Sequence, residues 1–272
     1  MPARRRPPPP SPPVFADRAE AGVLLGAALR AALGKFNPDH LERPVVFAIP
    51  RGGVAVAVGV AGCLGAPLDV IVVRKIGHPD APEYGLGAIA EGGEPVFDAA
   101  VLAEAGLSVA DLAAVVQRER AELARRVAVY RGAIGGYGVG AYGAGGQAVG
   151  GPTAPGEGAR LAIVVDDGLA TGVTARAALR AVARRLGGDG ADGPSGAGGG
   201  PVAVRTVLAV PVAAQGSLDA INAEADEVVT VVTTRRLRSV GEWYVDFGQL
   251  TDHDVLTLLS SSEGKPRTEG EP

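Results

Sequence analysis

The stretch Leu161-Ala-Ile-Val-Val-Asp-Asp-Gly-Leu-Ala-Thr-Gly-Val-Thr174 decides the fold. Its apolar run, residues 161–165, is too short for a core helix but suits a strand that is buried on both faces of a parallel sheet. Small residues and hydroxyls follow, and residues 175–186 then combine good helix formers with an apolar face. A buried strand, a tight turn and a helix in this order indicate an α/β protein.

The turn between this strand and this helix has the chemistry of an anion site. The N-terminus of a helix presents unpaired backbone N–H groups, and Thr171 and Thr174 add hydroxyl donors. Asp166 and Asp167 fall at the carboxyl edge of the sheet, where open α/β folds bind ligands. Two carboxylates repel a phosphate unless a cation or sugar hydroxyls lie between them, so we expect a phosphorylated sugar with Mg2+. The structural alternative is a solvated strand end followed by a capped helix.

Composition limits the class of protein. The 272 residues suffice for one α/β domain with additions, or for at most two small domains, and 47% of them are apolar, which allows a substantial core. The net charge of −4 gives no reason to expect a nucleic-acid partner. Cys63 is the only cysteine, so an intrachain disulfide and a cysteine-based zinc site are excluded. The apolar stretch 21–33 follows charged residues and suits an amphipathic helix, so we expect a cytoplasmic protein without a membrane partner.

Hydrophobic periodicity predicts a parallel sheet of about five strands with helices on both faces. Strands are predicted at 45–49, 68–73, 161–165, 202–210 and 227–232, and helices at 16–33, 54–64, 108–129, 175–186, 216–224 and 252–259. Residues 74–97, with many glycines and prolines, are expected to form a mobile excursion with short strands. Residues 1–13 and 260–272 are expected to be disordered tails, which leaves a domain at 14–259 with glycine-rich insertions at 131–158 and 187–200.

Two short motifs in the glycine-rich segments support no function. Gly138, Gly140 and Gly143 satisfy G-x-G-x-x-G, but no predicted strand precedes them and no helix follows. The surroundings of Ser195 miss the G-x-S-x-G nucleophile motif by one residue.

Residues 164–174, Val-Val-Asp-Asp-Gly-Leu-Ala-Thr-Gly-Val-Thr, resemble the PRPP (5-phosphoribosyl 1-pyrophosphate) signature of type I phosphoribosyltransferases. The resemblance implies the fold of that family, with a small variable hood, and the Mg2+-dependent transfer of phosphoribose from PRPP to a nitrogen acceptor, as in nucleotide salvage. It assigns PRPP binding to Arg51, Gly52, Asp166, Asp167, Ala170, Thr171, Gly172 and Thr174. It assigns catalysis to Arg74, Lys75, Asp166 and Asp167, of which Asp166 and Asp167 also hold Mg2+, directly or through water. The sequence leaves open whether the protein forms a homodimer.

The turn at residues 50–53, Pro-Arg-Gly-Gly, follows the first predicted strand. Glycine allows close approach of the backbone, and Arg51 supplies a fork of donors for phosphate oxygens. In the family that the chain resembles, this turn holds the pyrophosphate through a non-proline cis peptide bond, which the resemblance places at Arg51–Gly52. The alternative is an ordinary turn between a strand and a helix.

Arg74 and Lys75 begin the excursion at 74–97, where the resembled family has a flexible loop that closes over the pyrophosphate. Such a lid excludes water from a reactive sugar cation, and the two basic side chains would stabilise the leaving group. The alternative is a solvated hairpin with a basic start. Glu83 and Glu91 in the same segment are candidate proton acceptors.

The acceptor is less constrained. Ala170 stands where 6-oxopurine transferases carry an aspartate, so the signature looks more like the adenine type. Candidates for the hood are residues 14–44 and 233–259, including Arg235, Arg236, Trp243 and Tyr244. The two aromatic residues either stack on a base or anchor the C-terminal segment to the core.

Two other functions compete with the transferase. A PRPP-sensing regulatory module uses the same fold, because fold does not fix function. A sugar-phosphate hydrolase is disfavoured, since the sequence offers no recognisable nucleophile or metal cluster.

Overall fold

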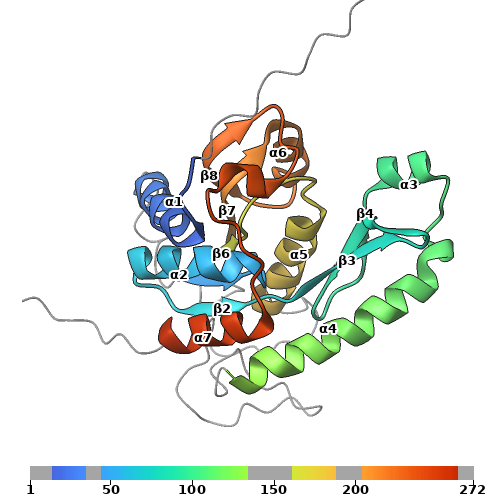
Figure 1. Cartoon of the computed structure of the whole chain (residues 1–272), viewed down its shortest axis with the longest axis horizontal. Coiled ribbons are helices and arrows are strands. Elements are labelled where there is room, and N and C mark those ends of the chain that lie inside the picture. Colours follow the sequence, from blue (N-terminus) through green and yellow to red (C-terminus); the bar gives the residue numbers. More distant parts are fainter. Residues whose placement is uncertain (1–13, 35–43, 134–160, 188–203, 263–272) are drawn as a thin grey trace, which may run out of the picture.

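The computed structural model describes residues 14–34, 44–133, 161–187 and 204–262, and its centre is a five-stranded parallel sheet (Figure 1). The strands have the order β2-β1-β6-β7-β8, and every adjacent pair is parallel. Their bounds are β1 (Pro44–Ala48), β2 (Leu68–Val70), β6 (Leu161–Val165), β7 (Arg205–Ala214) and β8 (Glu227–Thr234). The predicted fold class is confirmed.

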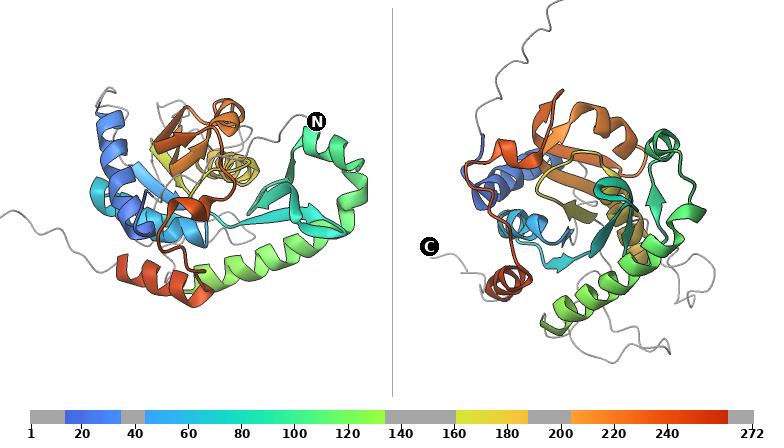
Figure 2. Two further views of the ribbon diagram at one scale, coloured as in Figure 1. Left: turned by 45° about the horizontal axis from the view of Figure 1, so that its top comes forward. Right: turned by 45° about the vertical axis from the view of Figure 1, so that its right-hand side comes forward.

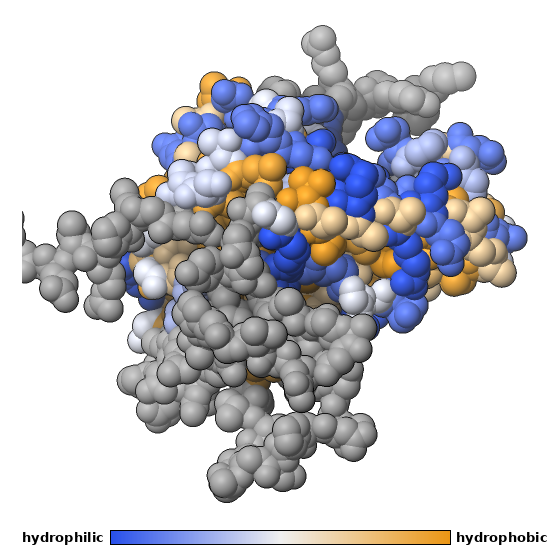
Figure 3. Space-filling model, turned by 90° about the horizontal axis from the view of Figure 1, so that it is seen from below, coloured by the Kyte–Doolittle hydropathy of each residue, from blue (hydrophilic) through white to orange (hydrophobic). Residues whose placement is uncertain are grey.

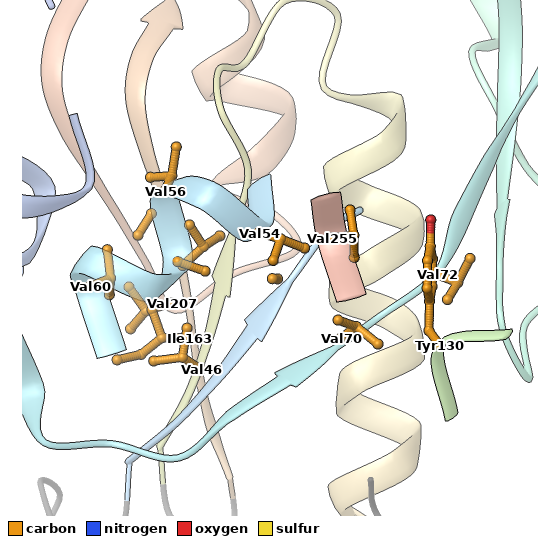
Figure 4. Close-up of a cluster of buried hydrophobic side chains, with 14 of the residues drawn as sticks. Val46, Val54, Val56, Val60, Val70, Val72, Tyr130, Ile163, Val207 and Val255 are labelled. Atoms are coloured by element: carbon orange, nitrogen blue, oxygen red, sulfur yellow. The ribbon is translucent and has the colours of Figure 1, made fainter. Parts of the chain in front are cut away.

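Helices cover both faces of this sheet. The helices of the described chain are α1 (Arg18–Leu33), α2 (Gly52–Leu64), α3 (Ala99–Ala105), α4 (Ala113–Ala133), α5 (Val173–Gly187), α6 (Gln215–Ile221) and α7 (Asp252–Ser262), of which α3 and α4 belong to the part around the second sheet. Alternate residues of each strand point to opposite faces, so Val46 and Ile163 pack under α1, α2 and α7, while Phe47 and Val164 pack under α5 and α6. Figure 4 shows part of the first of these cores, in which Tyr130 lies beside Val72 and Val255 beside Val54.

A second, antiparallel sheet extends to one side of the main sheet. It contains β3 (Val73–His78), β4 (Ala81–Ala90) and β5 (Val96–Phe97), in the order β3-β4-β5. After α3, the long helix α4 runs back along this sheet and ends beside α7 (Figures 1 and 2). Helix α4 is amphipathic, with Leu123 buried and Arg118 exposed. The molecular surface seen from below mixes hydrophilic residues with bands of apolar ones (Figure 3).

Several element boundaries differ from the prediction. The strand predicted at 68–73 is two strands in two sheets, because the chain leaves the main sheet at Ile71 and Val72. The helix predicted from Ser108 begins at Ala113, since Ser108 instead donates to Asp111 before a 3-10 helix at Ala110–Leu112. Helix α3 and a 3-10 helix at Val240–Trp243 were not predicted.

The predicted insertions and tails lie largely outside the described residues. Residues 131–133 complete α4, Gly187 completes α5, and residues 260–262 complete α7. The glycine motif at 138–143 and Ser195 also fall outside the described part of the chain.

A buried ionic cluster joins the two sheets. Arg131 at the end of α4 and Arg185 in α5 both bond to Asp69 of β2, at 2.7 and 2.6 Å, and to Glu91, at 2.6 and 2.9 Å. The Asp69 side chain is 1% exposed. Burial raises the pKa of Glu91, and the two arginines oppose that rise. Because Glu91 directly follows β4, the cluster fixes the root of the β3–β4 hairpin to the main sheet.

No helix in the described part of the chain is by itself long and apolar enough to cross a membrane; one pair, Ala99–Ala105 with Ala110–Gly132, meets the length and composition requirement jointly but is bent by 85°.

Candidate functional site

A cavity of about 360 Å³ opens at the carboxyl edge of the main sheet, where β1 and β6 end and β3 begins. It is lined by Ile49, Pro50, Arg51, Gly52, Val73, Arg74, Lys75, Arg126, Asp166, Asp167, Gly168, Leu169, Ala170, Thr171, Gly172, Thr174, Ala175 and Val240. The structure therefore brings together all the residues to which the resemblance assigns PRPP binding or catalysis, from segments far apart in the sequence.

The loop before α5 forms one end of the cavity. Its first part is held to β7, because Leu169 donates to the Val212 carbonyl at 2.8 Å and accepts from Ala214 at 2.9 Å. Gly172 has φ +82°, a conformation that favours glycine, and α5 begins at the next residue. The N-terminus of α5 and the exposed Thr171 thus form a cradle of donors suited to a phosphate.

Asp166 and Asp167 lie at the floor of the cavity, against the turn after β1. A Cβ atom on Gly52 would come within 1.9 Å of Asp167 Oδ2, and one on Gly53 within 2.7 Å of the Val165 carbonyl oxygen. Only glycine therefore allows this turn to approach the two carboxylates. Asp166 Oδ1 accepts the Asp167 backbone N–H at 2.9 Å, which fixes its orientation.

Burial opposes the charge of both carboxylates. It raises the pKa of Asp166 well above the ordinary value, and the negative charge of Asp167 raises it further. Burial also raises the pKa of Asp167, against the opposing charges of Arg18 and Lys75. A cation brought by a ligand would favour the charged form of both groups.

The same two side chains are the candidates for holding a metal. Within the described ranges, no group of three or more His, Cys, Asp or Glu side chains could hold a metal ion. Mg2+ is commonly bound through one or two carboxylates together with substrate phosphates, so Asp166 and Asp167 fit an ion that arrives with its ligand.

Sequence reasoning missed Arg18, in the first turn of α1. Its Nε donates to Asp167 Oδ2 at 2.9 Å and its Nη1 to the Gly248 carbonyl at 2.9 Å, while the guanidinium lies 3.7 Å from the centre of the Phe247 ring. In the sequence nothing distinguishes Arg18 from the solvated charges around it, since Asp167 is 149 residues away.

The opposite end of the cavity is basic. Arg51 Nη1 lies 4.0 Å from Asp252 Oδ1, and Arg74 donates twice to Glu119 Oε2, at 3.0 and 2.8 Å. Among the described residues Lys75 has no hydrogen-bond or ion-pair partner, and its charge acts on both aspartates. The cis peptide bond is Pro50–Arg51, so the prediction of Arg51–Gly52 was wrong by one residue.

Six candidate residues lie outside the cavity. Glu83 is exposed on β4, Glu91 belongs to the ionic cluster, and Arg235 and Arg236 are exposed after β8. Trp243 and Tyr244 are 8% and 4% exposed and pack with Phe15.

The two aromatic residues anchor the C-terminal segment rather than present a stacking surface. The Phe15 and Tyr244 ring centres lie 5.2 Å apart, and Val245 N–H donates to the Phe15 carbonyl at 2.8 Å. The Tyr244 hydroxyl donates to the Asp167 carbonyl at 2.6 Å, which connects this anchor to the floor of the cavity.

Comparisons with known proteins support one family. No protein-family model matches the sequence. Two putative phosphoribosyl transferases of Mycobacterium tuberculosis, MT0597 (strain CDC 1551 / Oshkosh) and Rv0571c (strain ATCC 25618 / H37Rv), are 37% identical over 246 residues. These matches cover 90% of the chain and 46% of each relative, so the chain spans about half their length. The crystal structure of TT1426 from Thermus thermophilus has a TM-score of 0.62 and 36% identity, over 91% of this chain and 98% of that one.

Proposed function

The chain belongs to the family of TT1426, a phosphoribosyltransferase-like family by the names of its curated relatives, and we propose that it is a phosphoribosyltransferase. Its substrates would be PRPP and a nitrogen acceptor, a nucleobase or a related amine, with Mg2+ as cofactor and pyrophosphate as product. One observation carries the proposal. A single cavity combines a helix N-terminal cradle, a pair of carboxylates and a basic wall, in that order across the carboxyl edge of the sheet.

This order matches the charge distribution of PRPP. The 5′-phosphate would lie at the N-terminus of α5, where backbone N–H groups and Thr171 offer donors. The ribose hydroxyls would face Asp166 and Asp167. The pyrophosphate would reach the wall formed by Arg51, Arg74 and Lys75.

Transfer would break the bond between C1 of the ribose and the pyrophosphate oxygen, and form one between C1 and the acceptor nitrogen, whose proton would pass to the released pyrophosphate or to water. The transition state resembles an oxocarbenium ion, with negative charge growing on the leaving pyrophosphate. Arg51 and Lys75 would stabilise that charge. Asp166 and Asp167 would orient the ribose and hold Mg2+, which supplies further charge neutralisation when bound.

A PRPP-sensing module is the second candidate function. One observation favours it: Glu83 and Glu91, the two acids considered as proton acceptors, both lie outside the cavity. A sensor needs only the binding groups and no carboxylate to act as a base toward an acceptor.

The test is a screen of nucleobases, orotate and simple amines with PRPP and Mg2+, in which the release of pyrophosphate is measured. The transferase predicts release that depends on one acceptor class and disappears in the Asp166→Asn/Asp167→Asn double variant. Binding of PRPP by calorimetry, without release for any acceptor, would favour the sensor. Absence of PRPP binding would refute both functions.

A further inference from the structure

Helix α4 brings one more arginine to the basic end of the cavity. Arg126 lines the cavity together with Arg51, Arg74 and Lys75, and its side chain is 16% exposed. Its Nε donates to Glu122 Oε1 at 2.9 Å. Within the described part of the chain, neither terminal nitrogen of Arg126 has a hydrogen-bond partner, so both are available to a ligand.

The neighbouring arginine provides a contrast. Arg125 is 53% exposed and lies outside the cavity. Its Nε and Nη2 both donate to Glu122, at 2.7 and 2.9 Å, and Nη2 lies 3.6 Å from Asp252. Glu122 therefore binds two adjacent arginines, of which only Arg126 is directed to the cavity.

The position of Arg126 relative to the sheet indicates which part of a ligand it meets. The phosphate loop after β6 folds toward β7, through the pairing of Leu169 with Ala213. The Arg51 turn follows β1, on the other side of β6. Tyr130, one turn after Arg126, donates to Asp252 at 2.7 Å, and Asp252 in turn lies 4.0 Å from Arg51. Arg126 thus lies at the end of the cavity that Arg51 lines.

The charge environment of Tyr130 agrees with this placement. Burial raises the pKa of the Tyr130 hydroxyl, and the positive charges of Arg126 and Arg51 both oppose the rise. The two guanidinium groups therefore act on one point, at the junction of α4, α7 and the turn after β1.

We propose that Arg126 binds the pyrophosphate group of the substrate and that Glu122 positions it for this contact. The inference rests on the proposed function, because it names a further residue for the same ligand. No motif predicts it, since Arg126 lies in a helix that follows the second sheet rather than in a turn at the edge of the main sheet. The Nε–Glu122 bond leaves the paired terminal nitrogens to face phosphate oxygens.

Calorimetry with two probes, inorganic pyrophosphate plus Mg2+ and ribose 5-phosphate, tests this assignment on the full chain. Arg126→Ala should weaken pyrophosphate binding by at least about tenfold and leave ribose 5-phosphate binding within about twofold of wild type. Arg126→Lys should recover part of the affinity, because it retains the charge but loses the fork. Arg125→Ala, the matched control, should bind both probes like wild type.

Four outcomes would overturn the inference. One is a pyrophosphate affinity in Arg126→Ala equal to that of wild type, and a second is an equal loss of affinity in Arg125→Ala. Another is the loss of binding of both probes in Arg126→Ala and Arg126→Lys alike, which would show that Arg126 has a structural role. Failure of the wild-type protein to bind either probe would remove the proposed function itself and the inference with it.

Discussion

Asp166 is the residue at which the proposed binding of ligand and the stability of the fold conflict. Because burial raises its folded-state pKa, the folded protein binds more protons than the unfolded chain between the ordinary pKa and the raised one. Stability contributed by this group is therefore present in acid and lost as the pH rises through that window. Asp166→Asn should raise the free energy of unfolding at neutral pH, and the gain should vanish as the pH falls to about 4. Urea unfolding as a function of pH measures it.

Asp254 supplies a control of opposite sign. Hydrogen bonds from the Thr251 backbone N–H and hydroxyl, both 2.7 Å, lower its pKa. Asp254→Asn should therefore reduce stability at neutral pH and have no effect in acid. A loss of stability at neutral pH in Asp166→Asn would show that the cavity stabilises the charged form of this carboxyl.

Thr171 tests the phosphate end of the cavity. Thr171→Val removes one hydroxyl donor and keeps the backbone N–H groups of the loop. Affinity for ribose 5-phosphate should fall by about 1–3 kcal/mol, the scale of a hydrogen bond to a charged group. Calorimetry on Thr257→Val, an exposed threonine of α7, provides the control. Equal affinity in wild type and Thr171→Val would place the phosphate elsewhere.

At the scale of elements, β3 delivers two basic residues with different electrostatic surroundings. Arg74 is paired with Glu119 of α4, whereas Lys75 has no such partner among the described residues. If Lys75 acts on the leaving pyrophosphate, its charge matters more in the transition state than in the bound substrate. Lys75→Ala should lower kcat by about a hundredfold and weaken PRPP binding much less.

The kinetics of Lys75→Ala, once an acceptor is known, separate the two candidate functions. A sensor would show weaker PRPP binding without any turnover to lose. Arg74→Ala should have the smaller effect on kcat, because Glu119 already offsets the charge of that guanidinium.

Elements with a local signature were predicted best. Strand β6 was predicted at its observed bounds, and the helix after it within two residues at its start, because the apolar run and the small-residue turn leave little choice. The second sheet was not predicted from the sequence, because the first five residues of β4 are all exposed and the strand therefore lacks the alternation of apolar and polar residues. Contacts such as Arg74–Glu119 join distant segments, and no local pattern encodes them.

For the whole molecule, the segment that precedes α1 and the segment between β8 and α7 meet beside the cavity. Phe15 is fully buried against Tyr244, and Arg18 and Tyr244 both bond to Asp167. The sequence suggested residues 14–44 and 233–259 only as candidates for the hood, and no local pattern in it indicated that these segments pair with each other.

Phe15→Ala should lower the free energy of unfolding by about 3–5 kcal/mol, the usual cost of removing a buried aromatic ring. It should also weaken PRPP binding, because the pairing that places Arg18 beside Asp167 is lost. Chemical denaturation and calorimetry measure the two effects. Val14→Ala, at a neighbouring side chain that is 45% exposed, should change stability by less than about 0.5 kcal/mol. An unchanged stability in Phe15→Ala would mean that the terminal pairing contributes little to the fold.

The ionic cluster of Asp69, Glu91, Arg131 and Arg185 gives the hairpin the mechanics of a beam clamped at one end. Displacement of such a beam grows with distance from the clamp, so it is smallest near Val73 and Ala90 and largest at the turn between β3 and β4. The pairing is irregular around Gly77, which makes that point the natural place to bend. Lys75 lies on the clamped side of it. The tip of the hairpin therefore has the greatest freedom to move, whereas Lys75 keeps a fixed position in the cavity wall.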